Sequence, residues 1–526
     1  MTRLVSIASL TGLALLVAGC CEPLPPRKPT TPEPTPAPIE AAPAAEASAS
    51  EIPVVLLPSP ASSSVSFRFV FKAGSADDPV DLPGLTLLTA TLMTDGGTES
   101  LTYPELIEKL FPMAASVQVE VDRDETVFLG RCHKDHVAAY YELFRDVLTK
   151  PRLDPKDFER VRETLRSDLA LSLRGNDDEA LGKAALASVL YEGHPYGHPT
   201  LGSETGLGTA TLDDVKAQRG RVLCASRLTI GLAGAIPEGF ADKVRQDMKA
   251  LPCTCAPPAD LPPAPVPSGI EVLLVDKPSA EATAISIGEP IDVRRGDPDY
   301  PALKLVEAYF GQHRNSSGVL YTSLREKRGF NYGDYAYVEH FAQEGGERIP
   351  TPNISRRQQS FSIWLRPVAD KDKHFALRLA LAKLQELVDK GLTKEDFERT
   401  RAFVKRYYLT YAMTESSQLG YALDDRFYGL DKPYFEYLFG ALDKLDVEQV
   451  NAAIKRHLSK DKMKIAMVTR DAAKFADALV ADAPSPVTYA SPKPDDVVAE
   501  DKIVEGMKLG IPRSSITIVK VGDVFR

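Results

Sequence analysis

The chain contains an internal duplication, in which three short segments recur in the same order along 526 residues. The clearest copy is LDPKDFER at residues 153–160, which matches LTKEDFER at residues 392–399, and each string opens a helical pattern with an Asp or Thr cap. The other two pairs are a strand, turn and strand at residues 56–71 and 274–287, and a helix followed by a strand at residues 211–232 and 445–468. A repeat over this length predicts two similar folding units, residues 53–255 and 269–484.

A proline-rich stretch at residues 256–268 separates the two units, and we expect it to be a stiff linker. Each unit alternates strand-like with helix-like patterns, which predicts an α+β fold with a mixed or antiparallel sheet and packed helices in each half. Such a linker would let the two halves face each other as a clam shell.

Two further segments lie outside the repeat. The second unit has more residues between its repeat markers than the first, and the polar segment 343–357 is the expected place for most of them, as a lid or as a disordered insertion. The C-terminal tail, residues 485–526, ends in an alternating run at residues 516–521. We expect this run either to add a strand to the body or to contact a partner.

The N-terminus has the pattern of a bacterial lipoprotein signal. Arg3 precedes an apolar run that ends in Leu-Val-Ala-Gly before Cys20, so residues 1–20 are assigned to the signal peptide and Cys20 is the expected lipidation site. Residues 21–52 are rich in Pro, Ala and Glu and predict a disordered tether. The protein is therefore expected in the bacterial cell envelope, lipid-anchored at the outer membrane and facing the periplasm, with an ordinary secretory signal as the alternative.

Charge and cysteine content bear on the partners and on disulfides. The net charge is −10 and no block of Lys and Arg occurs, which argues against nucleic acid as a partner.

The cysteines of the body are Cys132, Cys224, Cys253 and Cys255. Their pairing cannot be read from sequence, and we expect either structural thiols or one disulfide from the last two to Cys132 or Cys224.

Three motifs carry a resemblance that covers nearly all of the body. They are Pro-Gly-Leu at residues 83–85 leading to Asp-Gly-Gly-Thr at 95–98, His-Pro-Tyr-Gly-His-Pro at 194–199, and Leu-Arg-Glu-Lys-Arg-Gly-Phe-Asn-Tyr at 324–332. The last string is the most specific. Together they resemble the insulinase, pitrilysin and mitochondrial-processing-peptidase family of inverted zincins, which implies a peptide as substrate.

Active members of that family carry H-x-x-E-H on a helix, where two histidines bind zinc and the Glu is the base for the attacking water. In register with Gly84 the three motif positions here are Leu87, Ala90 and Thr91, and none of these side chains can ligate zinc or accept a proton. A catalytic zinc needs about three protein ligands, so a downstream Glu such as Glu163 does not repair the site. These residues predict no cofactor bound by this chain, and the resemblance implies that a partner carries the zinc.

Other histidines could in principle replace the motif. His194 and His198 are four residues apart, but prolines follow both, which predicts a structural turn and not a helix face. A second set lies together where a strand gives way to a helix, without a fourth ligand nearby in sequence. Its members are Cys132, His133 and His136.

The resemblance implies a retained substrate-binding pair in the second half. In active relatives an Arg near a helix end, and a Tyr seven residues later, reach the substrate carbonyl near the zinc; here these positions are Arg325 and Tyr332. A guanidinium can hold a carbonyl or carboxylate, and a phenol can donate to a developing oxyanion. The alternative is that both residues are only structural.

A lost metal triad with a retained Arg–Tyr pair resembles the non-catalytic subunits of two-chain members. We therefore expect a membrane-anchored lipoprotein that is not an enzyme alone and that completes a peptide-binding chamber with a catalytic zinc-peptidase homologue in a hetero-oligomer. A homodimer is the other assembly that we expect. The alternatives are a non-enzymatic envelope binding or scaffold protein and a zinc metalloendopeptidase with an unrecognised metal site.

Overall fold

The computed structural model describes residues 51–252, 255, 258, 261–342 and 348–526. The signal peptide with Cys20, nearly all of the tether, and Cys253 lie outside the described residues. Among the helices of the described part, none is both long and apolar enough to cross a membrane.

The first half contains a five-stranded sheet in the order β1-β5-β2-β4-β3. Its strands are β1 (Val54–Pro58), β2 (Ser64–Phe71), β3 (Ser116–Val121), β4 (Thr126–His133) and β5 (Leu228–Gly234). Only β1 and β5 pair in parallel. The alternating sequence of β2 directs Phe67, Phe69 and Phe71 into a core shared with Tyr140 and Phe144.

Eight α-helices of the first half are described. They are α1 (Leu85–Asp95), α2 (Tyr103–Leu110), α3 (Val137–Thr149), α4 (Pro155–Ser167), α5 (Asp178–Leu190), α6 (Glu204–Thr209), α7 (Leu212–Val222) and α8 (Phe240–Asp247). The repeated string opens α4, where Asp154 is the N-cap and accepts from the backbone N–H of Lys156.

The second half contains a six-stranded sheet in the order β11-β6-β10-β7-β9-β8. Its strands are β6 (Glu271–Asp276), β7 (Ala282–Ile291), β8 (Asp334–Tyr337), β9 (Gln359–Ala369), β10 (Lys464–Thr469) and β11 (Ile516–Lys520). Without β11, this order repeats that of the first sheet strand for strand. The predicted α+β class and the duplication are therefore confirmed.

The second half also carries eight described α-helices. They are α9 (Tyr300–Gly311), α10 (Lys373–Lys390), α11 (Lys394–Tyr407), α12 (Glu415–Tyr428), α13 (Tyr434–Leu442), α14 (Val447–His457), α15 (Ala472–Val480) and α16 (Asp495–Glu505). The second copy of the repeated string opens α11, where Thr393 caps the helix by accepting from the backbone N–H of Asp396.

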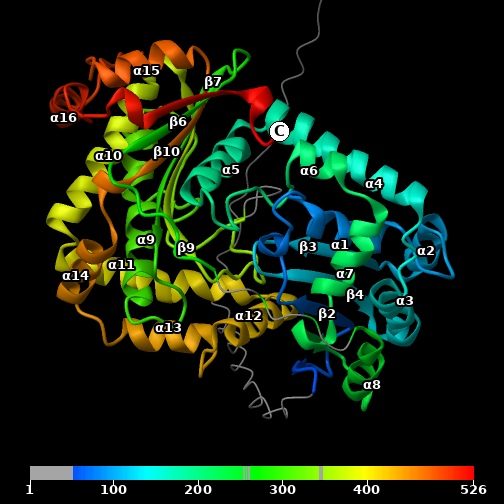
Figure 1. Cartoon of the computed structure of the whole chain (residues 1–526). Helices are drawn as coiled ribbons and strands as arrows, with labels where there is room; N and C mark the ends of the chain where they lie inside the picture. Colours follow the sequence, from blue (N-terminus) through cyan, green and yellow to red (C-terminus); the bar gives the residue numbers. More distant parts are fainter. Residues whose placement is uncertain (1–50, 253–254, 256–257, 259–260, 343–347) are drawn as a thin grey trace, which may run out of the picture. The chain divides into compact units, whose positions relative to one another are not determined.

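The two halves exchange one helix each. Helix α5 of the first half packs on β7 and β10 of the second sheet, and α12 of the second half packs on β1, β2 and β5 of the first (Figure 1). Leu181 and Ala185 of α5 are buried against the second sheet, and Leu419 and Leu423 of α12 are buried against the first. Each sheet thus completes its core with a helix from the other half.

The C-terminal tail connects both halves. Strand β11 pairs in parallel with β6 at the edge of the second sheet, so the tail adds a strand to the body. Beyond β11, the backbone carbonyl of Gly522 accepts from Arg174 (2.9 Å), and that of Phe525 accepts from the backbone N–H of Glu204 (2.9 Å). The last residues of the chain therefore contact the first half.

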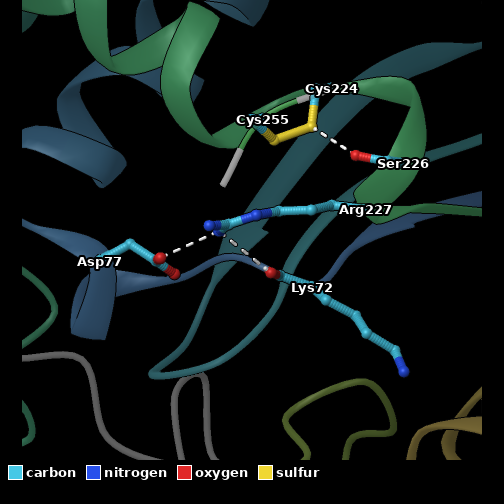
Figure 2. Close-up of a disulfide and its surroundings, with 6 residues drawn as sticks. All are labelled: Lys72, Asp77, Cys224, Ser226, Arg227 and Cys255. Carbon is cyan, nitrogen blue, oxygen red and sulfur yellow. Dashed lines mark hydrogen bonds and ion pairs between the residues drawn. A yellow bond between two sulfur atoms is a disulfide. The ribbon is translucent and has the colours of Figure 1, made fainter. Parts of the chain in front are cut away.

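One disulfide is present in the described part of the chain, between Cys224 and Cys255 (Figure 2). It is one of the pairings that the sequence left open. The other candidate, Cys132, is a buried free thiol on β4.

Residues 348–357, the described part of the polar segment in the second half, are held against the first half by polar contacts. The turn between β3 and β4 supplies their partners. The three pairs are Ser355 N–H to Glu125 (2.8 Å), Arg356 with Asp122 (2.6 Å), and Arg357 with Asp124 (2.8 Å). This part of the expected lid or disordered insertion is an ordered element of the interface between the halves.

Candidate functional site

Helix α1 presents the three positions of the missing zinc motif. Ala90 is fully buried in the core of the first half, Leu87 packs against the apolar cluster between α1 and α4, and Thr91 is half-buried. No imidazole or carboxylate stands at any of the three positions. The side chains do not fit a zinc ion, because neither an alkyl group nor a lone hydroxyl supplies the ligands that the metal needs.

Glu163 does not change this result. It lies exposed on α4 and pairs with Arg166 (2.9 Å). Across the described residues, no group of three or more His, Cys, Asp or Glu side chains is placed to hold a metal ion.

The N-terminus of α1 is instead built around a buried carboxyl that the sequence analysis missed. Asp78 accepts from the backbone N–H of Gly84 (2.7 Å) and from both the backbone N–H and the hydroxyl of Thr86 (2.7 and 2.6 Å). Gly84 has φ +96°, which favours glycine. Burial raises the pKa of Asp78 to about 7, although the three hydrogen bonds lower it. Gly84 and Thr86 therefore have a local structural role at the start of α1 that does not depend on a zinc motif.

The two histidines of the His-Pro-Tyr-Gly loop belong to a turn, as predicted. The Nδ1 atom of His194 accepts from the backbone N–H of Tyr196 (3.0 Å), and its ring packs edge-on against that of Tyr196. His198 lies with Nε2 4.0 Å from a carboxylate oxygen of Asp78, and burial lowers its pKa to about 4. Both rings therefore serve local structure.

The cysteine and histidines near residue 132 do not converge. Cys132 points into the core of the first half, whereas the next residue on the strand, His133, is exposed and lies 3.3 Å from Asp135. The rings of His133 and His136 are 6.4 Å apart. Strand alternation separates the thiol from the imidazoles.

Arg325 and Tyr332 lie together at the start of the second half's edge strand. Arg325 lies in a π-helical turn, Tyr321–Glu326, and donates from Nη1 to the backbone carbonyl of Tyr332 (2.9 Å). Its guanidinium lies 4.8 Å from the ring centre of Tyr321 and 5.8 Å from that of Tyr332. Gly329, with φ +75°, provides the turn between them. The Tyr332 side chain is 76% exposed, so its phenol is available to a ligand.

A buried carboxyl beside this pair is a second residue that the sequence analysis missed. Asp334 is fully buried; its Oδ1 accepts from Asn331 (2.7 Å) and its Oδ2 has no hydrogen-bond partner among the described residues. Burial raises its pKa to about 8, which exceeds the lowering by Asn331 and Arg325. Asp334 is therefore mostly neutral near pH 7. Among the described residues, Arg325 has no ion pair and keeps an uncompensated positive charge.

The first half adds an open sheet edge near α1. Strand β3 pairs with β4 on one side, and it is the last strand in the described order of its sheet. Alternate residues along it are exposed, and it contacts α1. An edge of this kind can accept an extended peptide as an additional strand.

Two family models match consecutive parts of the chain. The insulinase (peptidase family M16) model matches residues 53–204, and the peptidase M16 inactive domain model matches residues 209–404. Together they cover more than half of the chain, and the resemblance found in the sequence is confirmed.

Curated relatives differ in how they are described. A non-peptidase homologue, YmxG of Helicobacter pylori, is 20% identical over 417 residues, which are 76% of this chain and 87% of that protein. An uncharacterised zinc protease of Mycobacterium leprae is 23% identical over 402 residues, 74% of this chain and 83% of that protein.

Solved structures share the fold. A peptidase M16 inactive domain from Pseudomonas fluorescens superimposes with a TM-score of 0.69 at 24% identity, covering 80% of this chain and 96% of that one. A protease from Helicobacter pylori gives a TM-score of 0.67 at 13% identity, covering 80% and 97%. With Leu87, Ala90 and Thr91 in place of the zinc motif, this chain is a pseudopeptidase that belongs to the insulinase family of peptidases, M16.

Proposed function

We propose that this chain is the non-catalytic subunit of a two-chain peptidase, in which it completes a peptide-binding chamber with a homologue that carries zinc. The observation that carries the proposal is the contrast between the two halves. The zinc positions on α1 are apolar or a lone hydroxyl, while Arg325 and Tyr332 remain together, with the phenol exposed. A partner's zinc would supply the activated water that this chain cannot.

The charges around the pair support a role toward a peptide. Within the part of the chain that the structure describes, Arg325 faces a neutral Asp334 and is otherwise held by a backbone carbonyl and two aromatic rings. A guanidinium in this state can accept a peptide carbonyl or a carboxylate as a further hydrogen-bond partner. The exposed phenol of Tyr332 can donate to an oxyanion on the same ligand.

Placement in the envelope belongs to the same proposal. Cys20 would carry the lipid, and residues 21–52 would hold the body away from the outer membrane on its periplasmic side. Metabolic labelling with a fatty-acid analogue tests this: label should be lost in Cys20→Ala and kept in Cys21→Ala. Equal labelling of the two variants, or none in the native chain, would contradict the anchor.

The partner is tested by purifying the full chain from native membranes in mild detergent and identifying what accompanies it by mass spectrometry. We expect an intact H-x-x-E-H homologue in stoichiometric amount. Recovery of the chain alone, or only as a homodimer without metal or peptidase activity, would favour the alternative function of an envelope scaffold.

The pair is tested in the recovered complex. Arg325→Gln and Tyr332→Phe should each lower kcat/KM for peptide hydrolysis by about tenfold or more, because each removes a group directed at the reacting carbonyl. Lys327→Gln is the matched control, since Lys327 lies on the surface two residues from Arg325 and pairs with Asp496 (3.5 Å). Unchanged turnover in all three variants would exclude the role of the pair.

A further inference from the structure

A cavity of about 250 Å³ lies between the two halves, and neither Arg325 nor Tyr332 lines it. The first half contributes Lys72, Asp77 and Asp124 to its wall, and the second half contributes Arg294, Arg357 and the aromatic residues Phe427 and Tyr428. We call it the interhalf pocket. None of the functional residues considered above lines it, so the proposed function does not account for it.

The two carboxylates of the interhalf pocket are already neutralised. Asp124 pairs with Arg357 (2.8 Å) and also accepts from the phenol of Tyr196. Asp77 pairs with Arg227 (2.9 Å), which lies beneath the disulfide (Figure 2). Among the described residues of the wall, these ion pairs leave no carboxylate to balance further positive charge.

Two cations of the wall have no such partner. Neither Lys72 nor Arg294 forms an ion pair within the described residues, and Figure 2 shows the Lys72 side chain extending away from Asp77. The Lys72 ammonium lies 5.8 Å from the ring centre of Phe427. Burial lowers the pKa of Lys72, and the nearby Arg426 lowers it further. The positive charge of this wall is therefore partly desolvated and uncompensated.

One further acidic side chain acts on Lys72 and raises its pKa. Glu125 lies near Lys72, but it is fully buried, accepts from the backbone N–H of Ser355, and has its pKa raised well above the usual value by burial. A neutral Glu125 does not balance Lys72. The wall therefore keeps a net positive charge near neutral pH.

We propose that the interhalf pocket binds a small oxyanion, with the anionic group held between Lys72 and Arg294 and the rest of the ligand against Phe427. Phosphate and carboxylate groups are the usual partners of Lys and Arg side chains, and the aromatic wall can pack against an apolar part of the ligand. Because its two cations come from different halves, the ligand would bridge the halves and stabilise their association.

The test is isothermal titration calorimetry of the full chain with inorganic pyrophosphate and, in a separate arm, with citrate, at constant ionic strength. We expect saturable binding of at least one probe, which identifies the phosphate or the carboxylate as the preferred group. Lys72→Met and Arg294→Gln should each weaken binding by about tenfold, because each removes one charge-assisted contact. Bound probe should also raise the Tm of the native chain.

Lys134→Met is the control for general surface charge, because Lys134 is exposed, does not line the interhalf pocket and has no ion pair within the described residues. It should leave the affinity unchanged. Absence of saturable binding by both probes would overturn the proposal, as would affinities that fall equally in Lys72→Met and Lys134→Met, because the latter result indicates general attraction to surface charge. Neither outcome depends on a zinc-bearing partner, so the proposed function is tested separately.

Discussion

The ammonium of Lys183 lies 3.5 Å from the centre of the Trp364 ring, although the two residues belong to different halves. Lys183 is on the exchanged helix α5, and Trp364 is on β9 of the second sheet. Beside them, Glu179 of α5 pairs with Arg366 of β9 (3.3 Å). The exchanged helix is therefore positioned by charged and aromatic contacts as well as by its apolar face.

The stability of the chain should depend on the protonation of Lys183. Burial lowers its pKa from 10.5 to about 7, although Glu179 raises it. The folded chain binds this proton less tightly than the unfolded chain. The loss of folding stability caused by burying the protonated ammonium is therefore fully present below about pH 7 and declines as the pH rises toward 10.5. We expect the native chain to gain stability relative to Lys183→Met between pH 7 and 9.5, measured by urea denaturation. Parallel pH profiles would contradict this expectation.

Asp334 should produce the opposite pH dependence. Its pKa of about 8 in the folded chain lies above the ordinary value of 3.8, so the carboxyl ionises more readily in the unfolded chain. The resulting loss of folding stability is absent below pH 3.8 and complete above about pH 8. Relative to Asp334→Asn, the native chain should lose stability from pH 5 to pH 8. Thermal unfolding measures this, with the exposed Asp431→Asn as control. A native-to-variant difference that stays constant with pH, as in the control, would argue against a buried neutral Asp334.

The contact of α12 with the first sheet should depend on Gly231 of β5. A Cβ atom at this position would lie 2.8 Å from Leu423 of α12 and 2.9 Å from the backbone carbonyl of Arg68. We expect Gly231→Ala to lower the free energy of unfolding by about 1–3 kcal/mol, the usual cost of overpacking.

Gly220→Ala is the matched control for this substitution. Gly220 lies in helix α7, and a Cβ atom there would meet nothing within 4 Å, so alanine should be neutral or stabilising by up to about 1 kcal/mol. Equal unfolding free energies for the two variants in urea would show that α12 is not packed closely on β5.

The sequence predicted the repeated sheets, because strand alternation and the two capped helices recur in fixed order. It did not predict the exchange of α5 and α12. The apolar face of a helix shows that the helix is buried but not which sheet covers it. Nor did it predict that residues 352–357 are fixed between the halves, because their Asn, Ser and Arg side chains have the composition of a surface loop.

Part of the candidate site could be predicted from the sequence, and part of it could not. The positions of Arg325 and Tyr332 came from a specific string of residues, and the structure places the two side by side. Asp334 was missed because an Asp after Gly at the start of a strand is typical of an exposed turn, whereas here the strand pairing directs it inward. The interhalf pocket was missed because Lys72 and Arg294 come from different halves.

The disulfide between Cys224 and Cys255 should stabilise the first half by closing a loop, since the two cysteines are 31 residues apart. Replacing both by Ser should lower the free energy of unfolding by about 2–4 kcal/mol, because the unfolded chain gains conformational freedom. The measurement is thermal unfolding with and without a thiol reductant. Reductant should lower the Tm of the native chain to that of the double variant and leave the variant itself unchanged. A reductant effect of equal size on both proteins would assign the redox-sensitive stability to other cysteines.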